Sequence, residues 1–232
     1  MRIAQRQCHD HQLPELQRGL YLTEHRRCYD DIVGYCNALV YQGVLEPLRG
    51  DPKRHVPWGI LSMVSVEEPS RSYGGSRGNP GEAKRIAQWL SPERENILHY
   101  ARQTDPKLVD KSDEEVLKTS VGIITPFSKQ ATLIRTELRR QGIDGLTVGT
   151  VHSLQGDERL LVLFSSVYGM NDKGTGKFYD RGPNMLNVAV SRAKDSFIVF
   201  GHSDVFGTEN RGTPSGLLRQ RLSMDASTAE VT

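Results

Sequence analysis

The segment 150–158 (TVHSLQGDE) carries hydroxyl, imidazole and amide groups close together. Thr150, His152 and Ser153 can donate hydrogen bonds to phosphate oxygens without reading a base. A strand expected at 146–151 ends in this segment and a turn begins there, and the carboxyl ends of parallel strands are where α/β proteins place ligand groups. A turn with a local serine cap explains the same residues without a ligand. Taken alone, the segment favours that simpler interpretation.

A second segment, 187–194 (NVAVSRAK), places Arg192 and Lys194 at the end of an apolar helix expected over 184–194. An arginine offers a rigid fork of donors that can neutralise charge on a transferring phosphoryl group. The alternative is a cation that stabilises the carboxyl end of its own helix.

A third segment, 174–177 (GTGK), imitates the end of a Walker A phosphate-binding loop. However, Asn171 stands where the first glycine belongs, and Phe178 stands where a Ser or Thr should hold Mg²⁺. We therefore interpret 174–177 as a flexible loop.

The elements that position these residues follow from the hydropathy pattern. Apolar runs without polar alternation, separated by helical segments, are typical of a parallel sheet covered on both faces. We therefore predict an α/β fold. The expected strands are 58–66, 121–125, 146–151, 160–167 and 197–201, and the expected helices are 29–41, 80–91, 128–141 and 184–194.

The helix at 80–91 has a clear start signal. Asn79 can cap it, Pro80 suits the first helical position, and Glu82 can reach back to the cap. The preceding residues, 67–80, are expected to form an exposed connection, and 92–118 to form helix plus surface loop.

Composition sets broader limits. The 232 residues carry a formal net charge of +2, so a nucleic-acid role must come from local charge. No apolar run approaches the ~20 residues of a membrane helix, and the first residues do not resemble a signal peptide. Membrane partners are therefore not expected. Three cysteines without a CxxC pair do not indicate a disulfide framework, which favours a cytoplasmic location.

Five blocks, in this order, resemble the second RecA-like motor domain of superfamily 1B helicases, the group of the nonsense-mediated-decay helicase. The blocks are 22–28 (LTEHRRC), similar to the family's Gln-Tyr-Arg segment, 76–83 (SRGNPGEA), 123–130 (IITPFSKQ), 150–158, similar to motif V, and 186–194, similar to motif VI. The resemblance predicts a RecA-like parallel sheet flanked by helices on both faces. It assigns 21–205 to that domain, leaves 1–20 unassigned and makes 206–232 a C-terminal tail.

The resemblance implies a role for each matched residue. Arg27 and Arg192 match arginines that reach the γ-phosphate of ATP bound between two RecA-like domains, so both should lie on one edge and be at most loosely paired. Glu158, with Gly156 in the same motif, matches the acid that contacts the nucleotide. Arg26 stands where the family often stacks an aromatic ring on adenine, and a guanidinium can also stack on a base. The residues implied to face the nucleic-acid strand are Thr125, Pro126, Phe127, Thr150, His152 and Ser153.

The implied function is the C-terminal motor half of an ATP-dependent 5′-to-3′ helicase or translocase acting on single-stranded DNA or RNA. ATP with Mg²⁺ would be shared with an N-terminal RecA-like domain in the same or another chain, because these 232 residues contain no Walker A domain. The chain alone is expected to be inactive. The alternative is a non-hydrolysing nucleic-acid-binding or regulatory module, against which the two arginines argue.

Zinc is a weaker alternative for the first block. Cys8 with His11 and His25 with Cys28 are zinc-compatible residue types. The resemblance already accounts for His25 and Cys28, and this spacing is less diagnostic than CxxC. We therefore expect no metal site, and Cys36 is expected in the core.

Overall fold

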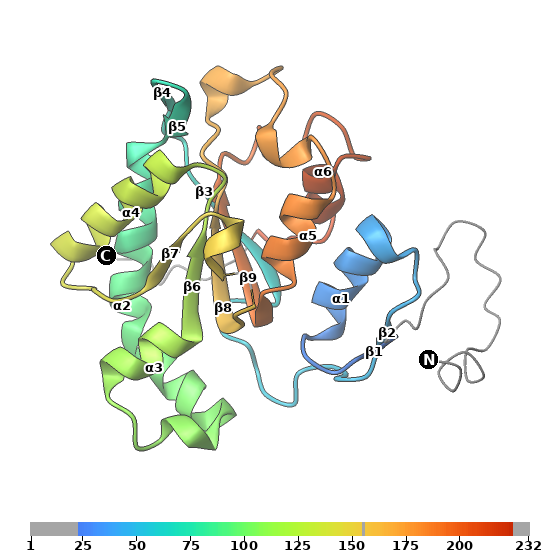
Figure 1. The fold of residues 1–232 in the computed structure, drawn as a ribbon, viewed down its shortest axis with the longest axis vertical. Coiled ribbons are helices and arrows are strands. Elements are labelled where there is room, and N and C mark those ends of the chain that lie inside the picture. The colour runs from blue at the N-terminus through green and yellow to red at the C-terminus, as the bar shows by residue number, and fades with distance from the viewer. Residues whose placement is uncertain (1–22, 155, 225–232) are drawn as a thin grey trace, which may run out of the picture.

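The computed structural model describes residues 23–154 and 156–224. Its centre is a five-stranded, all-parallel sheet in the order β3–β9–β8–β6–β7. Helices lie on both sides of this sheet (Figure 1). The predicted α/β fold of RecA-like type is therefore confirmed. The strands are β3 (Leu61–Ser65), β6 (Val121–Ile124), β7 (Thr147–Gly149), β8 (Arg159–Ser165) and β9 (Ala193–Gly201).

The two faces of the sheet are buried in two separate cores. In β8, Leu161 and Leu163 join one core, whereas Val162 and Phe164 join the other. Because both faces of the sheet are covered, consecutive residues of the strand are apolar, and the sequence shows no alternation of apolar and polar residues. The helices of the first core are α2 (Pro80–Thr104), α3 (Asp113–Ser120) and α4 (Ser128–Arg140); those of the second are α1 (Asp30–Cys36), α5 (Asn184–Val190) and α6 (Pro214–Arg219).

Smaller elements complete the described chain. These elements are the parallel pair β1 (Glu24–His25) and β2 (Glu46–Pro47), the hairpin β4 (Arg71–Tyr73) and β5 (Ser76–Gly78), a π-helical turn Asn37–Tyr41, and 3-10 turns Pro106–Leu108, Val151–Leu154, Met170–Asp172 and Phe178–Asp180. Strands β4 and β5 form a hairpin within the connection 67–80, which the sequence predicted only as exposed.

Helix α2 begins at the predicted residue but ends later than predicted. It continues through Pro92 to Thr104, because its apolar face continues beyond the proline and is buried against the sheet. Asn79 caps it as predicted, accepting a hydrogen bond from the Glu82 amide at 3.0 Å. The Glu82 carboxylate does not return to the cap. It is fully buried and accepts hydrogen bonds from the Ser165 hydroxyl at 2.5 Å and the Val167 amide at 3.0 Å.

Two boundaries in the last third of the chain also move. Helix α5 ends at Val190, so Arg192 lies in the connection to β9, and Lys194 lies in β9 itself. The expected tail packs on the domain as far as Ser223, which pairs with Ser62. The predicted boundary at 205 therefore falls inside the packed unit. The segment 1–20 lies outside the described residues.

Within the described part of the chain, none of the helices has both the length and the apolar character needed to cross a membrane.

Candidate functional site

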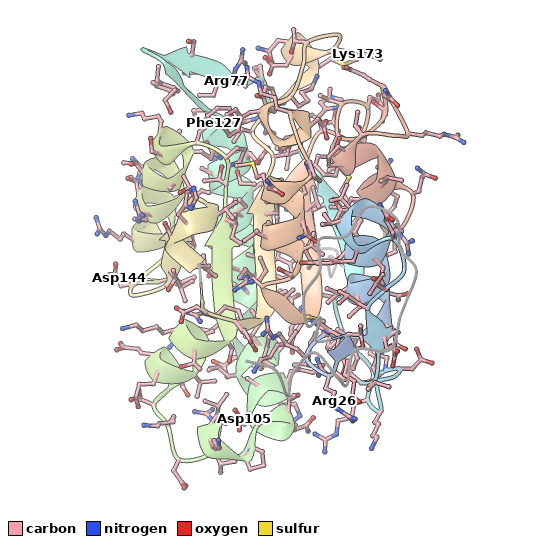
Figure 2. The ribbon with its side chains drawn as sticks, turned by 45° about the vertical axis from the view of Figure 1, so that its right-hand side comes forward. Arg26, Arg77, Asp105, Phe127, Asp144 and Lys173 are labelled. Carbon is pink, nitrogen blue, oxygen red and sulfur yellow. The ribbon has the colours of Figure 1, made fainter. Side chains whose placement is uncertain are left out.

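The predicted site residues lie at two opposite edges of the sheet. Glu158 and Arg192 come directly before β8 and β9, which places them at the amino edge. Phe127 and Thr150 follow β6 and β7 and lie at the carboxyl edge. Figure 2 shows Arg26 near one end of the molecule and Phe127 near the other. The segment 150–158 therefore contributes to both edges, and the sequence-based placement of all of it at a carboxyl edge was wrong.

At the amino edge, Glu158 is bound by two cations. Arg27 Nε lies 2.6 Å from Glu158 Oε1, and Lys194 Nζ lies 3.5 Å from Oε2. Arg27 was expected to be at most loosely paired. The short contact with Glu158 shows that this expectation was wrong. The Arg27 side chain is 40% exposed, so solvent screens the pair and its contribution to stability is small. The pair fixes the position of Arg27 more than it stabilises the fold.

Arg49 holds the backbone beneath this pair. Its Nη1 donates to the carbonyls of Arg27 at 2.8 Å and Lys194 at 2.7 Å, and its Nη2 donates to Asp195 Oδ1 at 2.6 Å. Its guanidinium carbon lies 3.8 Å from the Tyr29 ring centroid. Asp195 is almost fully buried, so it needs this partner. Sequence reasoning missed Arg49, because a contact across 146 residues leaves no local pattern.

The basic side chains face an open cleft of about 530 Å³. Four cations and two acids line it, so the cleft has a positive balance that favours anionic ligands. Its lining residues are Arg26, Arg27, Arg49, Thr104, Asp105, Glu158, Leu160 and Lys194. Arg26 is exposed and pairs with Glu24 at 3.1 Å, so it is free to reorient at little cost. Gly156 lies nearby in the chain with a φ of +86°, a conformation that favours glycine.

Arg192 is held more weakly than Arg27. Its guanidinium donates to Val188 O at 3.4 Å, Ser191 Oγ at 3.4 Å and Asp157 O at 3.5 Å. Among the residues that the structure describes, no carboxylate pairs with it. Its long hydrogen bonds to neutral oxygens leave its charge available to a ligand at the amino edge.

The Cys28 thiol lies beneath these arginines and belongs to the core. Its sulfur donates to Ser191 O at 3.9 Å, and burial raises the pKa of Cys28 to about 12, although Arg27 and Arg192 act in the opposite direction. Burial and the charge of Arg27 lower the pKa of His25. Cys36 is buried in the same core, as predicted. The other half of the zinc hypothesis, Cys8 and His11, lies outside the described residues.

At the carboxyl edge, the predicted strand-facing residues are not equally accessible. Thr125 and Pro126 are buried, and the Thr125 amide donates to Gly149 O at 2.9 Å. These two residues therefore lie behind the surface, which corrects the expectation that they face a strand directly. The residues that reach the surface there are Phe127 and Thr150, which are partly exposed, and His152 and Ser153, which are exposed.

Lys177, the residue that imitated a Walker lysine, is buried. Its Nζ donates to the carbonyls of Asp172 at 2.9 Å and Thr175 at 2.5 Å, and it pairs with Glu209 Oε1 at 3.1 Å. These contacts tie the loop 172–177 around the lysine. Its lysine is therefore unavailable to phosphate, as expected for a segment that only imitates a Walker A loop.

Comparisons with known proteins identify the family of the chain. A sequence model described as an AAA domain, AAA_12, matches residues 3–204. The chain belongs to this AAA_12 family. It is 27% identical over 194 residues to "RNA helicase Mov10l1" of Mus musculus, covering 79% of this chain and 16% of that protein. It is 28% identical over 200 residues to "Putative helicase MOV-10" of Gallus gallus, covering 79% of this chain and 20% of that protein.

Both relatives are named helicases, which supports the predicted resemblance to a helicase motor domain. The AAA_12 chain spans a fifth or less of the two relatives' lengths. Among solved structures, it matches the C-terminal domain of a possible DNA helicase from Lactobacillus plantarum WCFS1, with 10% identity, a TM-score of 0.42, and coverage of 76% of this chain and 86% of that one.

Proposed function

We propose that this chain is one half of an ATP-driven motor that moves 5′-to-3′ along single-stranded nucleic acid. Two observations carry the proposal: the cationic cleft at the amino edge, and Arg192 at the same edge, which has no carboxylate partner among the described residues. A nucleotide triphosphate fits this chemistry, since guanidinium groups bind phosphate oxygens in a bidentate manner.

In this proposal, Arg27 and Arg192 contact the γ-phosphate of ATP bound to a P-loop domain in the same or another chain. ATP supplies the phosphoanhydride bond that is cleaved, and the P-loop domain would hold Mg²⁺. To contact the γ-phosphate, Arg27 must break its ion pair with Glu158 and form one with a phosphate oxygen, so that one anion replaces another at the same guanidinium. Lys194 remains to balance the released carboxylate. Arg26 would lie against the adenine.

At the carboxyl edge, Phe127, Thr150, His152 and Ser153 would contact the strand. Hydroxyl and imidazole donors bind phosphates without reading sequence, as a translocating motor requires. The relatives are named RNA helicases or helicases, which favours RNA as the strand. The cytoplasmic location expected from the cysteines stays a prediction.

The alternative is a nucleic-acid-binding module that takes part in no hydrolysis. Such a module has no use for Arg192, an arginine that lies at the edge opposite the strand-binding residues and that no described carboxylate pairs with. ATP turnover separates the two candidates. We would mix the 232-residue chain with a P-loop RecA-like domain from the same organism and measure RNA-stimulated phosphate release.

The decisive variant is Arg192→Ala, with Arg139→Ala as its control, because Arg139 lies exposed on α4 and pairs only with Asp144 among the described residues. Arg192→Ala should lower turnover by about 10³-fold, as for other arginine fingers. Arg192→Lys should restore little, since a point charge lacks the bidentate fork. Full turnover in Arg192→Ala, or turnover by the chain alone, would refute the proposal.

A further inference from the structure

A second cleft, of about 260 Å³, lies at the carboxyl edge. Figure 2 labels two of its residues, Arg77 and Phe127, at the end of the molecule opposite Arg26. Four separate segments build it: the hairpin β4–β5, Phe127 in the connection that follows β6, Tyr168 in the connection that follows β8, and the segment 175–181. Its side chains are the aromatic rings of Phe127, Tyr168 and Phe178, the cations Arg77 and Arg181, and the hydroxyls of Ser72, Ser76 and Thr175.

The aromatic residues form a fixed platform. The Phe127 centroid lies 5.8 Å from that of Tyr168, at an interplanar angle of 67°, and 5.8 Å from that of Phe178, at 42°. The Phe178 amide donates to the Tyr168 hydroxyl at 2.9 Å, which fixes the backbone that carries the outer ring. Phe178 is nevertheless 40% exposed. A large ring that is held in place and partly open to solvent is suited to stacking on a flat ligand.

The charge around this platform is positive. The guanidinium carbon of Arg181 lies 5.4 Å from the Phe178 centroid, and that of Arg77 lies 5.3 Å from the Tyr168 centroid. Arg77 is already paired with Asp172. Arg181 is exposed, and no carboxylate pairs with it in the part of the chain that the structure describes. None of the lining residues is acidic.

We propose that this cleft binds one unstacked nucleobase of a single strand on Phe178, with the adjacent phosphate on Arg181. Base–aromatic stacking tolerates every base, and an arginine beside the ring adds both a phosphate ligand and a cation–π contact. The cleft is smaller than the ~300–1,000 Å³ of a drug-sized pocket, which suits one base and not a whole dinucleotide. The proposal rests on the proposed function, since the ligand is the strand that the motor would follow.

The test is the affinity of the 232-residue chain for a fluorescent oligouridine of about 12 nucleotides, measured by anisotropy at low salt. Phe178→Leu keeps the apolar contact with Phe127 but removes the stacking face. It should weaken binding at least about fivefold, the lower end of what stacking contributes. Arg181→Ala should weaken binding to a similar extent, and the control Arg139→Ala should leave it unchanged. Circular dichroism verifies that each variant folds.

An abasic oligonucleotide of the same length separates the two contacts. On it, Phe178→Leu should have no effect, whereas Arg181→Ala should still weaken binding. If the wild-type chain binds the oligouridine and both variants bind equally well, the cleft proposal is overturned and the proposed function stands. If the wild-type chain does not bind at all, the strand half of the proposed function fails, and the cleft proposal fails with it.

Discussion

The carboxyl group of Glu82 predicts an unusual dependence of stability on pH. It is fully buried near the N-terminal end of α2, between the Ser165 hydroxyl and the Val167 amide. Burial raises the pKa of Glu82 from 4.5 to about 8, and the hydrogen bonds from Ser165 and Val167 offset only part of that effect. In the unfolded chain the same group ionises at its ordinary pKa, so ionisation favours unfolding over the whole interval between the two values.

The sign and size of the effect follow directly. The contribution of the neutral group to stability is complete below a pH of about 4.5 and is lost as the pH rises to about 8. Each pH unit well between the two pKa values corresponds to about 1.4 kcal/mol, and the effect tapers near each pKa. The free energy of unfolding should therefore fall by about 3.5 kcal/mol between about pH 5 and about pH 8. Glu82→Gln removes the ionisation but keeps an oxygen that accepts the Val167 amide.

The assay is urea unfolding followed by circular dichroism at several pH values. Glu82→Gln should show a flatter pH dependence than the wild-type chain, and the two curves should diverge as the pH rises. Glu95→Gln is the control, because Glu95 lies exposed on the same helix. If wild type and Glu82→Gln lose stability in parallel from about pH 5 to about pH 8, the argument that burial governs this carboxyl is refuted.

Three further perturbations test other parts of the structure. Arg49→Ala should destabilise the chain by about 3 kcal/mol in urea unfolding, because it leaves the buried Asp195 carboxylate without its arginine; an unchanged midpoint would contradict the role assigned to Arg49. Gly122→Ala should cost about 1–3 kcal/mol, because the new Cβ would lie 2.5 Å from Leu154 Cδ2, and a stable variant would mean that Leu154 moves without cost. Binding of a single strand should depend only weakly on salt, with a slope of about one or two phosphates, and anisotropy titrations that give a steep slope would point to a larger basic surface.

The sequence predicted what depends on local pattern. Continuous apolar runs located the strands of the sheet, since residues buried on both faces leave no polar alternation. It could not predict the position of Glu82, whose type and spacing fit a capping box. The Glu82 carboxylate instead accepts a hydrogen bond from the amide of Val167, which follows β8 and is distant in sequence. Helix-start signals contain no information about such a partner.

The division of the segment 150–158 between two edges escaped prediction for a related reason. A motif is contiguous in sequence, so its residues are expected to share one site. The strand β8 begins at Arg159, directly after the motif, and this places Glu158 at the edge opposite Thr150. The length and direction of that connection are set by the pairing of β8 with β6, which is a long-range property of the sheet.

The segment around Ser223, near the end of the described chain, covers part of one edge of the sheet. Strand β3 is an outer strand of the sheet, and such a strand offers unpaired amides and carbonyls to other molecules. Here the Ser223 amide donates to Leu61 O at 3.0 Å and the Met63 amide donates to Ser223 O at 3.0 Å. The returning segment therefore shields that border from intermolecular strand pairing. A truncation before Ser223 would expose these backbone groups of β3 and should make the chain more prone to edge-to-edge aggregation.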